Sequence, residues 1–357
     1  MNALTPLAPS SFALSGVAVP LSASGMLEEI CEHFIEHAQV EQTANGAILR
    51  SADGLARLRI DAGRLLIDLD CPTADHLRLI QTSLAEHLFY FAEGEPFSLE
   101  WSGSNTVTRP PNLHEVTVVS AINVTPKMRR VTFSIADATP FASGDMHVQL
   151  LVPPHGRKPV WPGFREDGRL SWPQGEDELI ARTYTIRGVD CDARQFWIDI
   201  LLHGETGEVT PGADFARTAE PGTIAAIMGP GGGHVPDAST ILMIGDETAL
   251  PAIARIIEEV PEGTRITAIV EVESEAEQQS LRGRCKLDLR WLHRARNSAP
   301  SSSALLQAAT AAIDGMEAGT FVWAATEKQT IRSIRSLLKA RQYDRKLMYV
   351  AWYWERE

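Results

Sequence analysis

The strongest constraint on the fold of this chain is a change in the pattern of apolar residues near residue 237. Before it lie six β-branched runs bounded by Gly, Pro and Asp, with no long helical pattern between them: EVTVVSAINVT, MRRVTFSIAD, DMHVQLLVP, ARTYTIRGVD, QFWIDILLH and GTIAAIMGP. Such strands predict an antiparallel barrel or sandwich. After it, apolar strands alternate with helices, which indicates a parallel, doubly wound sheet whose ligands bind beyond the carboxyl ends of the strands.

The N-terminal third has a pattern of its own. SGMLEEICEHFIEHAQ and ADHLRLIQTSLAEHLFYFA place apolar residues at helical spacing, and GAILRS, LARLRID and RLLIDLDC alternate as short strands between them. PFSLEW closes this segment as a further strand, and the polar, Pro-rich residues 102–112 follow as a linker. Residues 22–103 are therefore expected to form a small α/β domain.

The first residues resemble a signal peptide only superficially. They contain no Lys or Arg, and Pro6, Pro9 and Pro20 interrupt the apolar run that a signal peptide needs. The expected chain is multidomain: a disordered extension (1–21), a small α+β domain (22–103), an antiparallel β-barrel (113–236) and a doubly wound α/β domain (237–357).

Composition excludes several classes of protein. A net charge of −13 argues against a nucleic-acid partner, and no run reaches the roughly 18 apolar residues that span a bilayer. The four cysteines form no CxxC pair, which argues against a zinc ribbon, an iron–sulfur cluster or a disulfide framework. A cytoplasmic protein without stable membrane insertion is expected, and a monomer is compatible with the sequence, which does not fix the oligomeric state.

One stretch runs against the overall charge. Residues 281–296 hold six basic residues and one acid. Such a stretch either attracts an anionic ligand or forms a solvated basic helix face without a ligand.

Three short motifs carry chemistry. In Arg182-Thr183-Tyr184-Thr185-Ile186-Arg187, an arginine fork suits pyrophosphate, a tyrosine ring suits an aromatic cofactor and a threonine suits the flavin edge; the alternative is a strand with an exposed arginine at each end. His203-Gly204-Glu205-Thr206-Gly207 brings two glycines close enough for backbone amides to approach phosphate, or is a plain hairpin turn. Gly245-Asp246-Glu247-Thr248-Ala249-Leu250-Pro251 follows an apolar strand and opens a helix, whose first amides suit phosphate or nicotinamide, or simply cap that helix.

In this order, together with Gly229-Pro230-Gly231 and the terminal Tyr353-Trp354, the motifs resemble the siderophore-interacting proteins of the ferredoxin–NADP reductase superfamily. The resemblance covers residues from about 114 to 357, while residues 22–103 look like a separate domain family of unknown function. It implies FAD on the barrel, NADPH or NADH on the α/β domain, and a ferric siderophore as substrate.

The same resemblance implies site residues. Those expected to bind the cofactors are Arg182, Thr183, Tyr184, Thr185, His203, Gly204, Gly207, Thr210, Asp246, Thr248, Glu327, Tyr353 and Trp354. Anionic siderophores favour a basic pocket, for which the candidates are Lys127, Arg130, Lys286 and Arg294. No catalytic side chain and no protein metal ligand are expected, because the flavin performs the chemistry and iron stays on the siderophore.

Two positions depart from the family pattern. The loop after His203 is longer by about three residues, with Thr210 as a possible replacement for a family serine, and Thr326-Glu327 stands where the family usually has Gly-Glu. A threonine there narrows the approach of a nicotinamide phosphate. Two other functions therefore stay open: a flavin reductase with a different electron acceptor, and a non-catalytic siderophore-binding module.

Overall fold

The computed structural model describes residues 12–35, 38–103, 109–204, 210–294 and 301–356. These fall into two compact units, each with its own core. One unit comprises residues 1–113 together with 158–179, and the other comprises residues 114–157 together with 180–357.

The first unit is built on one six-stranded sheet. Its strands are β1 (Phe12–Val19), β2 (Gln39–Thr43), β3 (Gly46–Arg50), β4 (Leu55–Asp61), β5 (Arg64–Cys71) and β6 (Ser98–Trp101). They lie in the order β2-β3-β4-β5-β1-β6, and neighbouring strands are antiparallel throughout.

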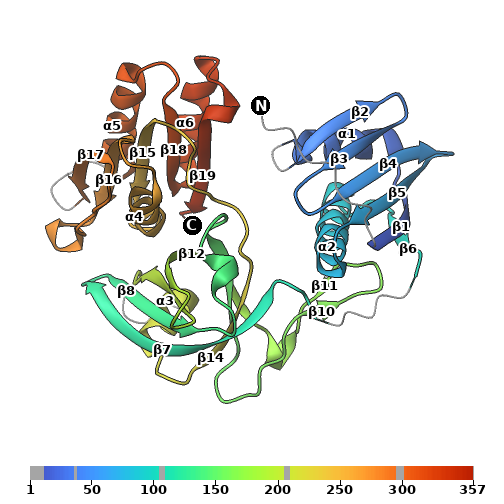
Figure 1. Ribbon diagram of the computed structural model, residues 1–357, viewed down its shortest axis with the longest axis horizontal. Helices are drawn as coiled ribbons and strands as arrows, with labels where there is room; N and C mark the ends of the chain where they lie inside the picture. Colours follow the sequence, from blue (N-terminus) through green and yellow to red (C-terminus); the bar gives the residue numbers. More distant parts are fainter. Residues whose placement is uncertain (1–11, 36–37, 104–108, 205–209, 295–300, 357) are drawn as a thin grey trace. The chain divides into compact units, whose positions relative to one another are not determined.

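Two helices pack together against this sheet (Figure 1): α1 (Ala23–Phe34) and α2 (Ala74–Phe91). Ser22 and Thr73 cap them, each accepting a hydrogen bond from a first-turn backbone amide, as N-cap residues do. Ile30 of α1 and Leu88 of α2 are fully buried with the inward side chains of the sheet.

The strand β1 corrects the expectation of a disordered extension over residues 1–21. Residues 12–19 pair with β5 on one side and β6 on the other, so they lie inside the sheet. Ala18 is fully buried there. Pro6, Pro9 and Pro20, which argued against a signal peptide, flank this strand in the sequence without entering it, and residues 1–11 lie outside the described part of the chain.

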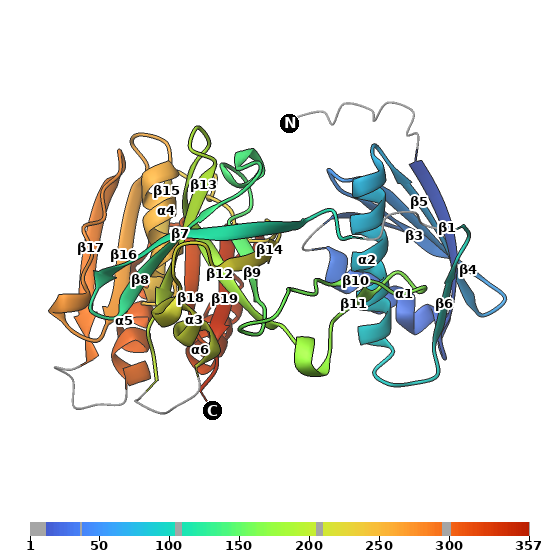
Figure 2. The same cartoon turned by 90° about the horizontal axis from the view of Figure 1, so that it is seen from below.

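The first unit also takes in a segment from the middle of the chain. Residues 158–179 lie within the expected barrel region yet pack with the N-terminal domain, and they include the two-stranded β10 (Gly163–Phe164) and β11 (Leu170–Ser171). This segment, called the excursion below, lies beside α2 (Figure 2). Thr82 of α2 donates to the Gly168 carbonyl at 3.1 Å, and the Arg169 guanidinium lies 3.3 Å from the centre of the Phe89 ring.

The second unit begins with a closed barrel, which confirms the expected antiparallel barrel. Its strands are β7 (Leu113–Thr125), β8 (Met128–Ser134), β9 (His147–Val152), β12 (Ile180–Asp190), β13 (Gln195–Leu201) and β14 (Ile224–Met228), in the order β12-β13-β8-β7-β14-β9. Phe133 and Phe196 stack in its core with ring centres 5.2 Å apart. The short helix α3 (Pro211–Thr218), which the sequence did not predict, packs against β12, β13 and β8.

A five-stranded parallel sheet completes the second unit, as the doubly wound prediction requires. Its strands are β15 (Thr240–Asp246), β16 (Arg265–Val272), β17 (Lys286–His293), β18 (Phe321–Glu327) and β19 (Met348–Trp354), in the order β17-β16-β15-β18-β19. The helix α4 (Leu250–Glu259) shares one core cluster with the sheet, while α5 (Ser301–Gly315) and α6 (Lys328–Ala340) share another. The chain reverses direction across the sheet between β15 and β18, where ligands of such folds bind.

The strand β17 corrects the helix-face alternative for residues 281–296. Leu287, Leu289 and Trp291 alternate along it and pack against the sheet core, while the intervening positions carry the charges. Apolar residues at every second position indicate a strand. The many basic residues of this segment made that alternation hard to recognise in the sequence.

Among the described residues, no helix has the length and apolar character needed to cross a membrane.

Candidate functional site

The two faces of β12 have separate roles. On one face, Ile186 is fully buried in the barrel core and Tyr184 packs against the same core, while Arg182 is exposed. On the other face, Arg187 pairs with Glu258 of α4 through two hydrogen bonds of 2.7 and 2.5 Å. Thr183 and Thr185 share a face with His147, which pairs in register with Thr185 and contacts Tyr353 of the α/β domain, so this face turns toward that domain.

The first turn of α3 lies against Tyr184 and Arg182. A Cβ atom added to Gly212 would come within 2.0 Å of the Tyr184 hydroxyl oxygen and 3.8 Å of Cγ of Arg182, so only glycine permits this approach. Burial raises the pKa of Tyr184 to about 12, so its hydroxyl keeps its proton. The first amides of a helix have no acceptor within the helix. Because Pro211 has no N–H, Gly212 and Ala213 supply the free amides of α3, and a helix start of this kind beside an exposed arginine suits an anion.

A hydrogen-bond network holds the loop that precedes α3. Asp214 accepts from the backbone N–H of Thr210 at 2.9 Å, and Arg217 donates to the Thr210 hydroxyl at 3.1 Å and to the His203 carbonyl at 2.8 Å. Gly204 has a φ of +88°, which glycine adopts without strain. Arg217 thus joins both ends of the expected pyrophosphate loop, whose Gly207 lies outside the described residues.

The C-terminal strand meets the barrel through His147 of β9. Nε2 of His147 lies 2.7 Å from the Tyr353 hydroxyl, and Nδ1 lies 2.9 Å from the Gly232 carbonyl. Burial lowers the pKa of His147 to about 4, so the ring is neutral at pH 7. Because His147 pairs in register with Thr185, the structure brings Tyr353 beside β12, the strand predicted to bind the flavin.

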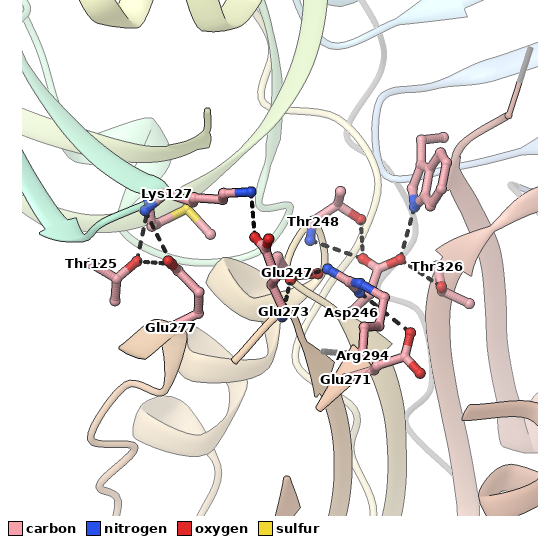
Figure 3. A network of polar contacts seen from close by, with 12 residues as sticks. Thr125, Lys127, Asp246, Glu247, Thr248, Glu271, Glu273, Glu277, Arg294 and Thr326 are labelled. Carbon is pink, nitrogen blue, oxygen red and sulfur yellow. Dashed lines mark hydrogen bonds and ion pairs between the residues drawn. The ribbon is translucent and has the colours of Figure 1, made fainter. Parts of the chain in front are cut away.

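Asp246, at the carboxyl end of β15, accepts four hydrogen bonds (Figure 3). Its Oδ1 accepts from the N–H and hydroxyl of Thr248 at 2.9 and 2.5 Å. Its Oδ2 accepts from the Thr326 hydroxyl at 2.6 Å and from Nε1 of Trp354 at 2.8 Å. The carboxylate therefore joins the β15–α4 turn, the end of β18 and the C-terminal strand at the point where the sheet reverses.

This arrangement explains the threonine that replaces the usual family glycine. Thr326 is 2% exposed, and its hydroxyl is used by Asp246. Glu327, the next residue, caps α6 by accepting from the Thr330 amide at 3.0 Å. Burial acts to raise the pKa of Glu327, but hydrogen bonds from the Gln329 and Thr330 amides outweigh it and leave the pKa below its usual value.

A second cluster occupies the carboxyl ends of β15, β16 and β17. Arg294 pairs with Glu247 and with Glu271, the latter at 3.3 Å, and the Glu273 amide donates to Glu247 at 2.7 Å. Burial raises the pKa of both Glu247 and Glu271, against the lowering effect of Arg294. Figure 3 shows the guanidinium lying between the two carboxylates.

The same cluster continues to the β7–β8 turn of the barrel. Lys127 pairs with Glu273, and Glu277 accepts from the Thr125 hydroxyl at 2.5 Å and from the Lys127 amide at 3.1 Å (Figure 3). Glu277 is 5% exposed, so these bonds hold the α/β domain against the barrel.

The four cations expected to bind an anionic substrate do not form one basic surface. Lys127 and Arg294 belong to the acidic cluster just described, and Arg130 makes two hydrogen bonds of 2.7 and 2.8 Å to Asp199. Lys286 begins β17, at the opposite end of that strand from Arg294. Their role in substrate binding stays a prediction, and each of the first three would have to exchange a carboxylate partner for the substrate.

The chain is similar to siderophore-related proteins of known structure and to two family models. A siderophore utilization protein from T. fusca has a crystal structure that is 33% identical to the chain, with a TM-score of 0.58, and the match covers 70% of this chain and 96% of that one. Residues 117–234 match the family model of the siderophore-interacting FAD-binding domain, and residues 238–357 match that of the siderophore-interacting protein. The chain belongs to the siderophore-interacting protein family.

Other relatives extend the comparison. An uncharacterised protein of Mycobacterium tuberculosis is 32% identical over 200 residues, which are 51% of this chain and 65% of that protein, slightly under two thirds of its length. The ferric vibriobactin reductase ViuB of Vibrio cholerae is 27% identical over 239 residues, which are 65% of this chain and 86% of ViuB. Residues 17–102 match a family of uncharacterised proteins conserved in bacteria.

FAD is the cofactor of this siderophore-interacting protein, and its barrel residues fit that group. The exposed Arg182 lies beside the first turn of α3, whose free amides suit an anion, and Gly212 leaves room for that approach. Tyr184 offers an aromatic ring beside the same site.

Four residues of the site were not predicted from the sequence. Pro211 and Gly212 look like a turn, although proline at the first helical position is a known start signal. Arg217 acts across a loop whose length is irregular. His147 is a lone histidine in a strand, and nothing in the sequence indicates that it contacts Tyr353, 206 residues later.

Proposed function

We propose that this siderophore-interacting protein is an NAD(P)H-dependent reductase of ferric siderophores. One observation carries the proposal: an anion site at Arg182 and α3 and a sheet reversal at Asp246 occur in the same compact unit, joined by the pair of His147 and Tyr353. The likeness to a ferric vibriobactin reductase supports the choice of substrate class.

Bound FAD would supply the redox chemistry, passing the two electrons of the NAD(P)H hydride one at a time to two Fe(III) ions, each held by a siderophore, with one proton released. The Fe(II) produced leaves because hard oxygen ligands hold it less tightly than Fe(III). The reaction would take place in the cytoplasm, where reduced nicotinamide cofactors are available.

The protein's own residues position the reactants. Arg182 and the first amides of α3 would bind pyrophosphate oxygens, and Tyr184 would contact the flavin system. Thr183 and Thr185 lie on the strand face that turns toward the α/β domain, where the flavin edge would be approached.

The nicotinamide would bind at the carboxyl ends of β15 and β18. Asp246 fixes Thr248, Thr326 and Trp354 around one carboxylate, so each of these side chains has a defined place before the cofactor arrives. Glu327 orders the first turn of α6, whose amides face the same end of the sheet.

An absorbance spectrum of the purified protein tests the proposal. Flavin bands that bleach under anaerobic NADPH or NADH, and recover as Fe(II) appears in a chelator trap after a ferric siderophore is added, are the expected result. Bleaching without Fe(II) would indicate a different electron acceptor. A protein that takes up no FAD but binds the ferric siderophore would instead be a non-catalytic binding module.

A further inference from the structure

The first unit contains a cavity of about 760 Å³ that the proposed reductase chemistry does not use. Helix α2, the end of β6 and the excursion line it, and every lining residue belongs to the first unit. Pockets for small molecules typically measure about 300–1,000 Å³. The cavity therefore has the size of a ligand site.

Four aromatic rings contribute to the lining of this cavity. Trp101, Trp161, Phe164 and Trp172 all contribute to it, so three of the chain's eight tryptophans gather in one place. Aromatic faces and edges favour a flat π system over an aliphatic group of the same size. The lining thus selects for planarity.

The charge of the lining differs from that of the surrounding sequence. Residues 1–110 hold 14 acidic and 6 basic residues, yet the charged residues of the cavity are Arg78, Arg165 and Glu166, a surplus of one positive charge. Although this part of the chain is acidic, the local charge of the cavity favours an anionic ligand.

Two polar side chains of the lining are almost fully buried. Arg78 and Gln81 are 4% and 2% exposed, and Nη1 of Arg78 donates to Oε1 of Gln81 at 3.0 Å. The Arg78 guanidinium also lies 4.1 Å from the centre of the Phe164 ring. Burial lowers the pKa of Arg78, and a negative charge in the cavity would favour its protonated form.

The wall contributed by the excursion is held in place by specific bonds. Nε1 of Trp101 donates to the Asp167 carbonyl at 2.8 Å, and Glu86 accepts from the Leu170 amide at 2.9 Å. Gly168 has a φ of +89°, and a Cβ atom there would lie 3.0 Å from Nε1 of Trp101. The cavity is therefore formed by folded structure on every lining element.

We propose that this cavity binds a planar aromatic anion of the aryl carboxylate or catecholate class. The rings of Trp161 and Trp172 stack on the ligand, while Arg78 and Arg165 meet its negative charge. The ligand is either a free aryl acid or an aryl arm of a ferric siderophore. The second source rests on the proposed reductase function, and the first does not.

Calorimetry on the full-length, oxidised protein tests the proposal with 2,3-dihydroxybenzoate as the probe. Cyclohexanecarboxylate has the same charge without aromaticity and should bind at least about tenfold more weakly. Trp172→Ala should weaken binding of the probe by about tenfold. Arg165→Ala, at an exposed position, should weaken the probe but leave neutral catechol unchanged.

The matched control is Tyr90→Ala. Tyr90 is on the same helix as Arg78 but is 75% exposed and outside the lining, so the variant should bind the probe like the unchanged protein. Equal binding of cyclohexanecarboxylate, or full binding by both Trp172→Ala and Arg165→Ala, would overturn the proposal, as would an absence of any binding.

A second titration, carried out on the unchanged protein and on Trp172→Ala, identifies the source of the ligand. Tighter binding of ferric tris-catecholate than of the free acid, weakened by Trp172→Ala, assigns the cavity to siderophore recognition, and the reverse preference assigns it to a free aryl acid. Because these titrations contain no NAD(P)H, a failure of the reductase assay would leave their result intact.

Discussion

Replacing Thr326 by valine removes one hydrogen bond from a buried carboxylate while keeping the side-chain shape. Thr326 and Asp246 are 2% and 3% exposed, and their hydrogen bond is 2.6 Å long. In Thr326→Val, Trp354 becomes the remaining side-chain donor to Oδ2 of Asp246 among those described. A hydrogen bond to a charged group contributes about 1.5–3 kcal/mol, so the free energy of unfolding should fall by roughly that amount.

Thermal and urea unfolding, followed by circular dichroism, measure the effect. In a unit of this size, 1 kcal/mol corresponds to about 2–4 °C, so the expected fall in Tm is roughly 3–12 °C. Thr326→Ser is the matched control, because it keeps the hydroxyl and loses one methyl group, worth about 0.8 kcal/mol. The explanation fails if Thr326→Val is as stable as the unchanged protein, or if Thr326→Ser loses as much stability as Thr326→Val.

Two further predictions concern the barrel. Gly212→Ala places a Cβ atom 2.0 Å from the Tyr184 hydroxyl, so the purified variant should retain less FAD per chain and lose about 1–3 kcal/mol of stability, measured by flavin absorbance and urea unfolding. In Gly315→Ala, the added Cβ atom would meet no neighbouring part of the structure within 4 Å, so flavin content and stability should not change. Equal flavin content in both variants would contradict the reasoning. His147, with a pKa of about 4 when folded against 6.5 as a free side chain, binds its proton less well in the native state, so stability should fall by about 1.4 kcal/mol per pH unit as the pH drops from 6.5 to 4. In His147→Gln, the urea midpoint should depend less on pH between 6.5 and 4. An unchanged pH dependence of the midpoint would show that other groups cause the loss of stability.

Local sequence patterns predicted the architecture of the second unit. The barrel strands and the parallel sheet each carry a clear period of apolar residues, and the fold class is confirmed. The elements that were missed share a physical cause. In β17 the charges at alternate positions hid the alternation of Leu287, Leu289 and Trp291, and in α3 the pair of Pro211 and Gly212 has the composition of a turn.

The sequence predicted only those site residues that stand in short local motifs. Arg182, Tyr184 and Asp246 were predicted as site residues because each stands in a short motif with a chemical meaning, and their role in cofactor binding stays a prediction. The partners of Lys127 and Arg294 were not, because an ion pair between residues 47 positions apart, such as Arg294 and Glu247, leaves no trace in local sequence. A basic side chain counted as available for substrate was therefore already paired.

The excursion has a consequence for the order in which the protein can fold during synthesis. The ribosome makes residues 12–103 first, but the unit to which they belong also needs residues 158–179. By the time those emerge, three of the barrel's six strands, β7, β8 and β9, have already been translated. The N-terminal unit must therefore wait, with the face of α2 beside Thr82 and Phe89 uncovered, until half of the next barrel has left the ribosome.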